Sequence, residues 1–93
     1  MIKLNYPKTI GEAVDILEHI LLDIEKEGIM NMPEQGVVDL YLVYGKWIKN
    51  NLGLCDGNYE LISDCNANEP EEASIVIIQA LWKTLNSHNN NEN

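Results

Sequence analysis

The sequence predicts an all-α protein, a small orthogonal bundle of three main helices plus one short helix. Three stretches carry apolar residues at spacings of three and four, which is the helical period. Helix-capping patterns precede these stretches, and the one apolar run that resembles a buried strand, Ile75–Ile78, has no second strand to pair with. We expect a single helical domain over residues 1–85 and a disordered polar tail over residues 86–93.

The first helix is expected to run from Ile10 to Glu27. Thr9 and Glu12 form the T-x-x-E capping box, in which each side chain satisfies a free backbone N–H group, and Gly28 is a natural stop. One side of this helix is apolar and the opposite side is acidic, so the apolar side should face the core. The expected core residues are Ile10, Ala13, Val14, Leu17, Ile20, Leu21 and Ile24.

The second helix is expected to begin near Pro33, with Asn31 as its N-cap, and to end at about Asn51. Its apolar residues point to more than one side, which is typical of a helix that is buried on several faces. We therefore expect this helix to lie at the centre of the fold.

The remainder of the domain is expected to hold the short helix and the third main helix. Asn58 can cap a brief helical turn over residues 59–63. The third helix should start at Pro70 or Glu71, because the helix dipole favours the acidic residues found there, and should end at Leu85.

The charge balance excludes one class of partner. The 93-residue chain has 6 basic residues, all of them Lys, against 15 acidic residues, which gives a formal net charge of −9. Binding to nucleic acid requires a basic patch, so we expect no nucleic-acid partner. The negative charge either attracts a basic partner or keeps the protein soluble, and both interpretations stay open.

The cysteines and the hydropathy bound the cellular setting. Cys55 and Cys65 lack the C-x-x-C spacing of a zinc site, so we expect free thiols, no metal and no cofactor. The first residues lack the apolar run of a secretory leader, and no apolar stretch approaches the ~20 residues that cross a bilayer. We therefore expect a cytoplasmic location and no membrane partner.

The sequence offers no catalytic set, and we expect no enzymatic activity. His19 lies on the acidic side of the first helix, with no Ser or Cys close to it in the sequence, and His88 lies in the expected tail. Cys55 has no neighbouring cation that would activate it as a nucleophile.

The stretch Gly45–Asn58 has the sequence GKWIKNNLGLCDGN. Together with Tyr6–Thr9, Glu12–Val14 and Pro70–Ser74, it resembles a family of small uncharacterised bacterial proteins with the central motif G-x-W-I-(R/K)-N-x-x-G-L-W-x-G-N. The resemblance covers about four-fifths of the chain. It supports a common fold and implies no reaction, because the family has no established activity.

Three positions depart from this family pattern. Cys55 stands where the family usually has Trp, and Tyr41 and Glu69 stand where it often has His. A metal-binding or acid–base role of those His residues therefore does not carry over to this chain.

The acidic side of the first helix is the leading candidate for a binding surface. Ile16 and Leu22 fall among its acidic residues, where they are either exposed by chance or anchor a partner inside an acidic rim. The second interpretation predicts a small protein-binding module, such as an inhibitor, immunity or anti-defence protein that docks on a basic surface. The predicted partner-binding residues are Glu12, Asp15, Ile16, His19, Leu22, Asp23 and Glu27.

The alternative function is a small-ligand binder or enzyme with a pocket at the motif. The pocket would be lined by Trp47, Lys49, Asn50, Asn58 and Tyr59. Lys49 and Asn50 also suit a purely structural joint, because Lys and Asn near a helix end stabilise the helix and the following loop. A homodimer that buries spare apolar surface of the second and third helices is a further possibility.

Overall fold

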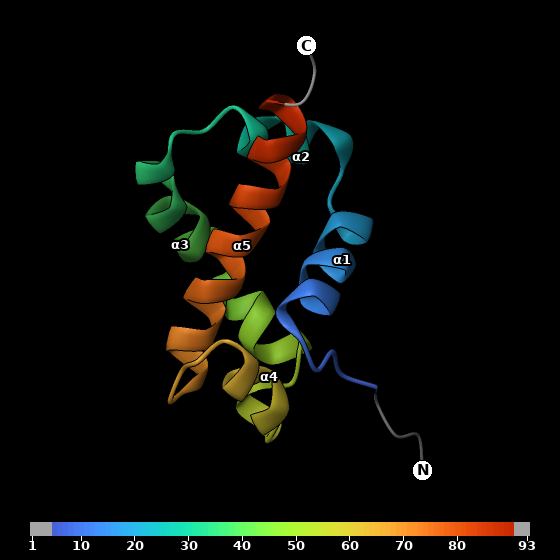
Figure 1. The fold of residues 1–93 in the computed structure, drawn as a ribbon, viewed down its shortest axis with the longest axis vertical. Coiled ribbons are helices and arrows are strands. Elements are labelled where there is room, and N and C mark those ends of the chain that lie inside the picture. The colour runs from blue at the N-terminus through green and yellow to red at the C-terminus, as the bar shows by residue number, and fades with distance from the viewer. Residues whose placement is uncertain (1–4, 91–93) are drawn as a thin grey trace.

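The computed structural model describes residues 5–90, and within this range every regular element is helical (Figure 1). Five α-helices are present, and short 3-10 turns at Glu34–Gly36 and Leu54–Asp56 precede α3 and α4. The all-α class is confirmed, with five helices in place of the expected four. The helices are α1 Ile10–Ile20, α2 Asp23–Met30, α3 Val37–Asn51, α4 Tyr59–Asp64 and α5 Pro70–Asn90.

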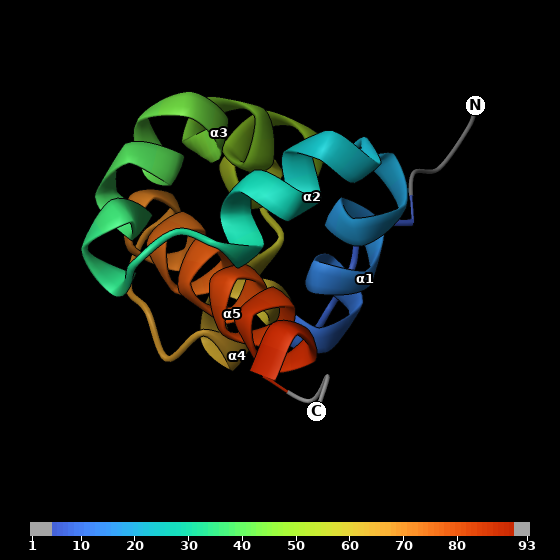
Figure 2. The ribbon, with the colours of Figure 1, turned by 90° about the horizontal axis from the view of Figure 1, so that it is seen from above.

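The central helix is α5, and α3, α2 and α1 form an arc around it (Figure 2). The buried residues of α5 recur at helical spacing along its length, so several neighbours can pack on it at once. A strand at Ile75–Ile78, the alternative that the sequence disfavours, is excluded because these residues lie inside α5. The buried residues of α5 are Ala73, Ser74, Ile77, Ile78, Leu81 and Leu85.

The expectation that the second helix forms the centre of the fold is wrong. That helix is α3, and it packs on α5 through one edge that includes Val37, Leu40 and Ile48. Tyr41 and Tyr44 are half-buried against the core. The large apolar side chains that are exposed on the other side of α3 are Val38, Leu42, Val43 and Trp47. The hydrophobic periodicity of the sequence shows that α3 is apolar on several sides, but it does not show which side packs against another helix.

The expected first helix is in fact two helices. The backbone leaves the helical conformation at Leu21 and Leu22, which have ψ values of 140° and 155°. The backbone N–H of Leu22 donates to the Glu25 carboxylate at 2.8 Å, so this side chain caps the start of α2. On the two sides of the break, α1 and α2 each pack against α5.

The break changes the predicted core. Leu21 packs against the hydrophobic core as expected, but Ile20 and Ile24 are exposed, contrary to the prediction. The other end of α1 agrees with the sequence, since the Thr9 hydroxyl accepts from the backbone N–H of Glu12 at 3.1 Å. The Glu12 carboxylate accepts from the backbone N–H of Lys8, one residue before the N-cap, and not from Thr9 as the capping box predicts.

The connection from α2 to α3 also differs from the prediction. Asn31 ends α2, with its side-chain amide donating to the Glu27 carbonyl at 3.0 Å, and is not the N-cap of α3. The helix α3 starts at Val37 because Pro33 is extended and a 3-10 turn follows it. The Trp82 indole N–H donates to the Met32 carbonyl at 2.7 Å and holds this connection against α5.

The helix α5 continues beyond its predicted end at Leu85 and reaches Asn90. The Asn86 amide donates to the Met30 carbonyl at 3.2 Å, so the first residue of the expected disordered tail is attached to the end of α2. The tail prediction is therefore wrong for residues 86–90, while residues 91–93 lie outside the described range. No helix in residues 5–90 is both long enough and apolar enough to cross a membrane.

Candidate functional site

The motif Gly45–Asn58 ends in a buried joint centred on the Asn58 side chain. Its amide nitrogen donates to the carbonyls of Pro7 and Leu52, each at 2.8 Å, and its amide oxygen accepts from the backbone N–H of Leu61 at 3.4 Å. The Asn58 side chain thus joins the N-terminal segment, the end of α3 and the start of α4. Both N–H donors of this side chain are used within the protein, and its oxygen already accepts one backbone hydrogen bond, so the side chain acts as a structural joint.

The N-terminal segment closes over the same loop. Gly53 adopts a left-handed conformation with φ of 77°, and a β-carbon at this position would collide with the Tyr6 ring. The Tyr6 hydroxyl donates to the Asp56 carboxylate at 3.2 Å. Desolvation, and then the hydrogen bond to Asp56, raise the pKa of Tyr6. Two segments that the sequence resemblance linked are therefore in direct contact.

The structure does not bring the predicted ligand-pocket residues together. Trp47 and Lys49 are two positions apart on α3, so they project about 200° apart around its axis. The Lys49 ammonium lies 5.7 Å from the centroid of the Tyr41 ring on the same helix. Asn50 and Tyr59 are exposed, and Asn58 is buried in the joint.

The cysteine thiols are free, and one of them is part of the core. The Cys65 thiol donates to the Ala73 carbonyl at 3.7 Å. Burial, and then the charge of Asp64, raise the pKa of Cys65 to about 11, so this thiol is neutral at physiological pH. Cys55 is exposed, and no group of three potential metal ligands occurs among the described residues.

A cleft of about 280 Å³ lies between the first half of α3 and α5. The rings of Tyr41 and Trp82 are among its walls, and Lys83 stands among its polar residues. Sequence reasoning missed this cleft because its walls come from segments about forty positions apart, which only the packing of α3 on α5 brings together. Its lining residues are Glu34, Gln35, Val37, Val38, Tyr41, Ile75, Gln79, Trp82 and Lys83.

An acidic hollow of about 340 Å³ lies where α1 gives way to α2. Carboxylates of Glu18, Asp23 and Glu27 line it, and Met30 and Leu85 contribute apolar surface. The one cation in the hollow is Lys26, whose ammonium lies 3.7 Å from the Asp23 carboxylate. This pair is exposed at Asp23 and is therefore weak.

Three large apolar side chains are exposed at the α1–α2 break, close in sequence to Glu18 and Asp23, which line this hollow. Ile20 is 50% exposed, Leu22 66% and Ile24 75%, all within five positions of the chain at the α1–α2 break. The expected exposure of Leu22 is confirmed. Ile16, the other expected anchor, is half-buried and packs against the hydrophobic core. We call the hollow and these three side chains the α1–α2 corner.

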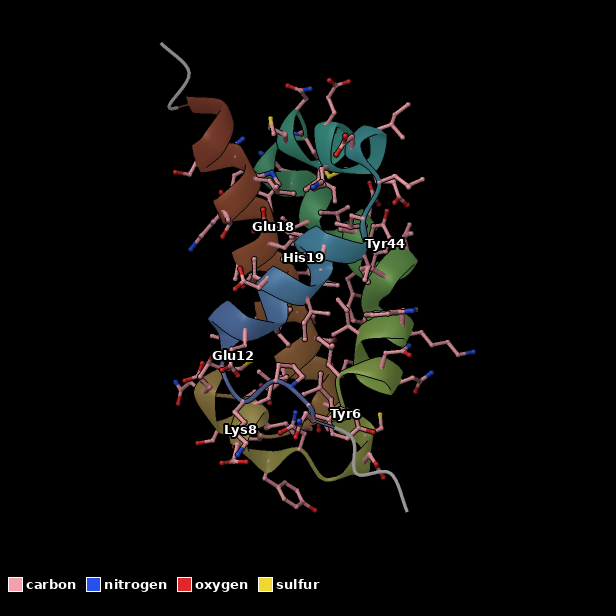
Figure 3. All side chains as sticks on the ribbon, turned by 90° about the vertical axis from the view of Figure 1, so that its right-hand side faces the viewer. Tyr6, Lys8, Glu12, Glu18, His19 and Tyr44 are labelled. Carbon is pink, nitrogen blue, oxygen red and sulfur yellow. The ribbon has the colours of Figure 1, made fainter. Side chains whose placement is uncertain are left out.

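The other predicted partner-binding residues lie along the outer side of α1. Glu12, Asp15 and His19 are exposed, with Glu12 near the start of the helix and His19 near its end (Figure 3). The His19 ring donates from Nδ1 to the Asp15 carbonyl at 2.7 Å. Because the helix breaks after Ile20, the seven predicted residues divide between α1 and the α1–α2 corner. Glu18, which also lines the hollow, was missing from the predicted set.

Comparison of the sequence with known protein families identifies one family. Residues 6–85 match the family model described as Domain of unknown function (DUF6794). The chain belongs to this family. No curated protein and no solved structure matches it. The matched DUF6794 range begins at Tyr6 and ends at Leu85, so it contains the joint at Asn58, the cleft between α3 and α5, and the α1–α2 corner.

Proposed function

We propose that this protein is a small protein-binding module that docks on a basic surface of another protein through the α1–α2 corner. One observation carries the proposal: three carboxylates line a single hollow at the α1–α2 break, and Leu22 and Ile24, the sequence neighbours of Asp23, are exposed apolar side chains. Exposed apolar groups inside a charged rim are typical of interfaces between proteins.

The hollow suits a Lys or Arg side chain of the partner. Met30 and Leu85 offer apolar surface to the methylene groups of such a side chain, and the three carboxylates offer acceptors to its charged end. Leu22 and Ile24 would then be buried against apolar groups of the partner. The corner thus combines a charge-specific contact with an apolar contact.

The charge of the segment favours rapid capture of such a partner. Residues 10–30 contain six acidic residues and only Lys26 as a cation. A concentration of one charge sign steers an oppositely charged protein toward the surface, and salt weakens this effect. Small acidic inhibitors, immunity proteins and anti-defence proteins act in this way, and we propose that the protein is of this type.

The test compares proteins from a host lysate that are retained by the immobilised chain at low and high salt. We expect a basic protein to be retained at low salt, and Glu27→Lys and Leu22→Arg each to weaken its binding about tenfold or more. Glu71→Lys is the matched control, because it makes the same charge change on an exposed residue at the start of α5. Equal retention by all variants, or no retention by the native chain, would exclude the corner.

A second candidate function is the binding of a small ligand in the cleft between α3 and α5. Two aromatic rings, Tyr41 and Trp82, with Lys83 beside them favour a flat apolar compound that carries a carboxylate. Such compounds should change the fluorescence of Trp82 in a Trp47→Phe background and raise the melting temperature. Gln79→Phe, which narrows the cleft without adding a tryptophan, should abolish both effects, and effects that persist in this variant would place the ligand elsewhere.

A further inference from the structure

The outer side of α3 has no neighbour within the described part of the chain. Four large apolar side chains on it are between 39% and 74% exposed, and two charged residues stand among them. The six residues fall into two ridges of side chains with a spacing of four, the spacing through which helices commonly interlock. The ridges are Val38–Leu42–Lys46 and Asp39–Val43–Trp47.

The two ridges are complementary when one of them is reversed. The first ridge presents, from its N-terminal end, two apolar side chains and then the ammonium of Lys46. The second ridge, followed from its C-terminal end, presents two apolar side chains and then the carboxylate of Asp39. A helix that pairs with an antiparallel copy of itself brings just such reversed ridges together.

We propose that this face binds a second copy of the chain, with the two α3 helices antiparallel about a two-fold axis between Leu42 and Val43. Leu42 then meets Val43 of the second copy, and Val38 meets Trp47 of the second copy. Asp39 meets Lys46 of the second copy. The symmetry makes each contact twice, as in any isologous dimer.

The reversed complementarity of the two ridges favours a second copy as the occupant. A chain with a net charge of −9 repels its own copies, so association is most favourable through a face that carries no excess of negative charge. The two ridges satisfy this condition with one carboxylate and one ammonium, neither of which has an ion-pair partner among the described residues. In Figure 2, α3 and α1 lie on different sides of α5, with α2 between them, so the α1 surfaces of the two copies would be kept apart.

Charge reversal tests the pairing. Asp39→Lys would place two lysines opposite each other at both ends of the contact, and we expect dimerisation to weaken by more than about tenfold. Lys46→Asp should do the same with paired carboxylates. The double variant Asp39→Lys, Lys46→Asp recreates both ion pairs with the net charge unchanged, and it should restore native dimerisation. Sedimentation velocity over a range of concentrations measures all four chains.

Two further variants separate the pairing from general charge effects and from misfolding. Asp15→Lys makes the same charge change as Asp39→Lys on the exposed side of α1, and it should leave the dimer intact or stabilise it. Leu42→Asp places a charge in the centre of the contact and should give a monomer with native helix content by circular dichroism.

Three results would overturn the proposal: a native chain that stays monomeric at millimolar concentration, a dimer that survives Leu42→Asp, or a folded double variant that does not regain dimerisation. None of these results bears on the α1–α2 corner, because none of the substituted residues belongs to it. Retention of a lysate protein by Asp39→Lys as by the native chain would show the two surfaces to be independent.

Discussion

The Asn58 side chain connects the loop after α3 to the N-terminal segment and to α4. It is 8% exposed and bonds to three separate backbone groups, from Pro7, Leu52 and Leu61. A buried backbone carbonyl that loses its donor stays desolvated without a hydrogen bond. Removing the donor therefore destabilises the fold by more than the net free energy that the bond contributes when it is formed. The residue is therefore structural, although its position in the motif first made it a candidate for binding.

Asn58→Ala should lower the free energy of unfolding by about 2–4 kcal/mol, because it leaves the carbonyls of Pro7 and Leu52 unsatisfied. Chemical denaturation followed by circular dichroism measures this change. Asn50→Ala is the matched control, since it removes the same amide from an exposed position on α3, and it should change stability by no more than about 0.5 kcal/mol. Similar losses in both variants would contradict a special role of Asn58.

At the scale of the elements, the break between α1 and α2 determines which side chains reach the surface. Glu25 holds this break from two sides, since it accepts from the backbone N–H of Leu22 at 2.8 Å and from the Tyr44 hydroxyl at 3.4 Å. Burial, and then the charge of Glu25, raise the pKa of Tyr44. The break also exposes Leu22 and Ile24, so the proposed interface depends on it.

Glu25→Ala should lower the free energy of unfolding by about 1 kcal/mol, because α2 loses its cap. The same substitution should lower the pKa of Tyr44 toward its ordinary value, since the neighbouring charge and the hydrogen bond are lost while burial persists. Denaturation and an ultraviolet titration of the tyrosines measure the two effects. Glu27→Ala serves as control, because Glu27 is exposed and its side chain caps nothing; a Tyr44 pKa equally lowered there would exclude a local cause.

At the scale of the whole molecule, charge is distributed unevenly over the surface. The α1–α2 corner carries three of the six acidic residues of segment 10–30, whereas the ridges of α3 carry balanced charge and four large exposed apolar side chains. Because α1 and α3 lie on different sides of α5, with α2 between them, one chain can offer both surfaces at the same time (Figure 2). A dimer through α3 would thus present two acidic corners to its partners.

The sequence by itself determined the helical class, because hydrophobic periodicity and capping are local properties of the chain. The Thr9 cap of α1, the Asn58 cap of α4 and the start of α5 at Pro70 all follow from neighbouring residues, and the structure confirms each of them. The joint at Asn58 was also foreseeable as a structural role, but not its partners, since Pro7 lies about fifty positions away.

Only the tertiary structure decided where the first helix breaks, which helix is central and which side chains line a hollow or a cleft. Ile20 and Ile24 fit a core stripe on one straight helix, yet they are exposed in a chain whose helix breaks between them at Leu21 and Leu22. The periodicity of a helix shows which side is apolar. Whether that side meets another helix, a ligand or a second molecule depends on packing between residues far apart in the sequence, which no local pattern records.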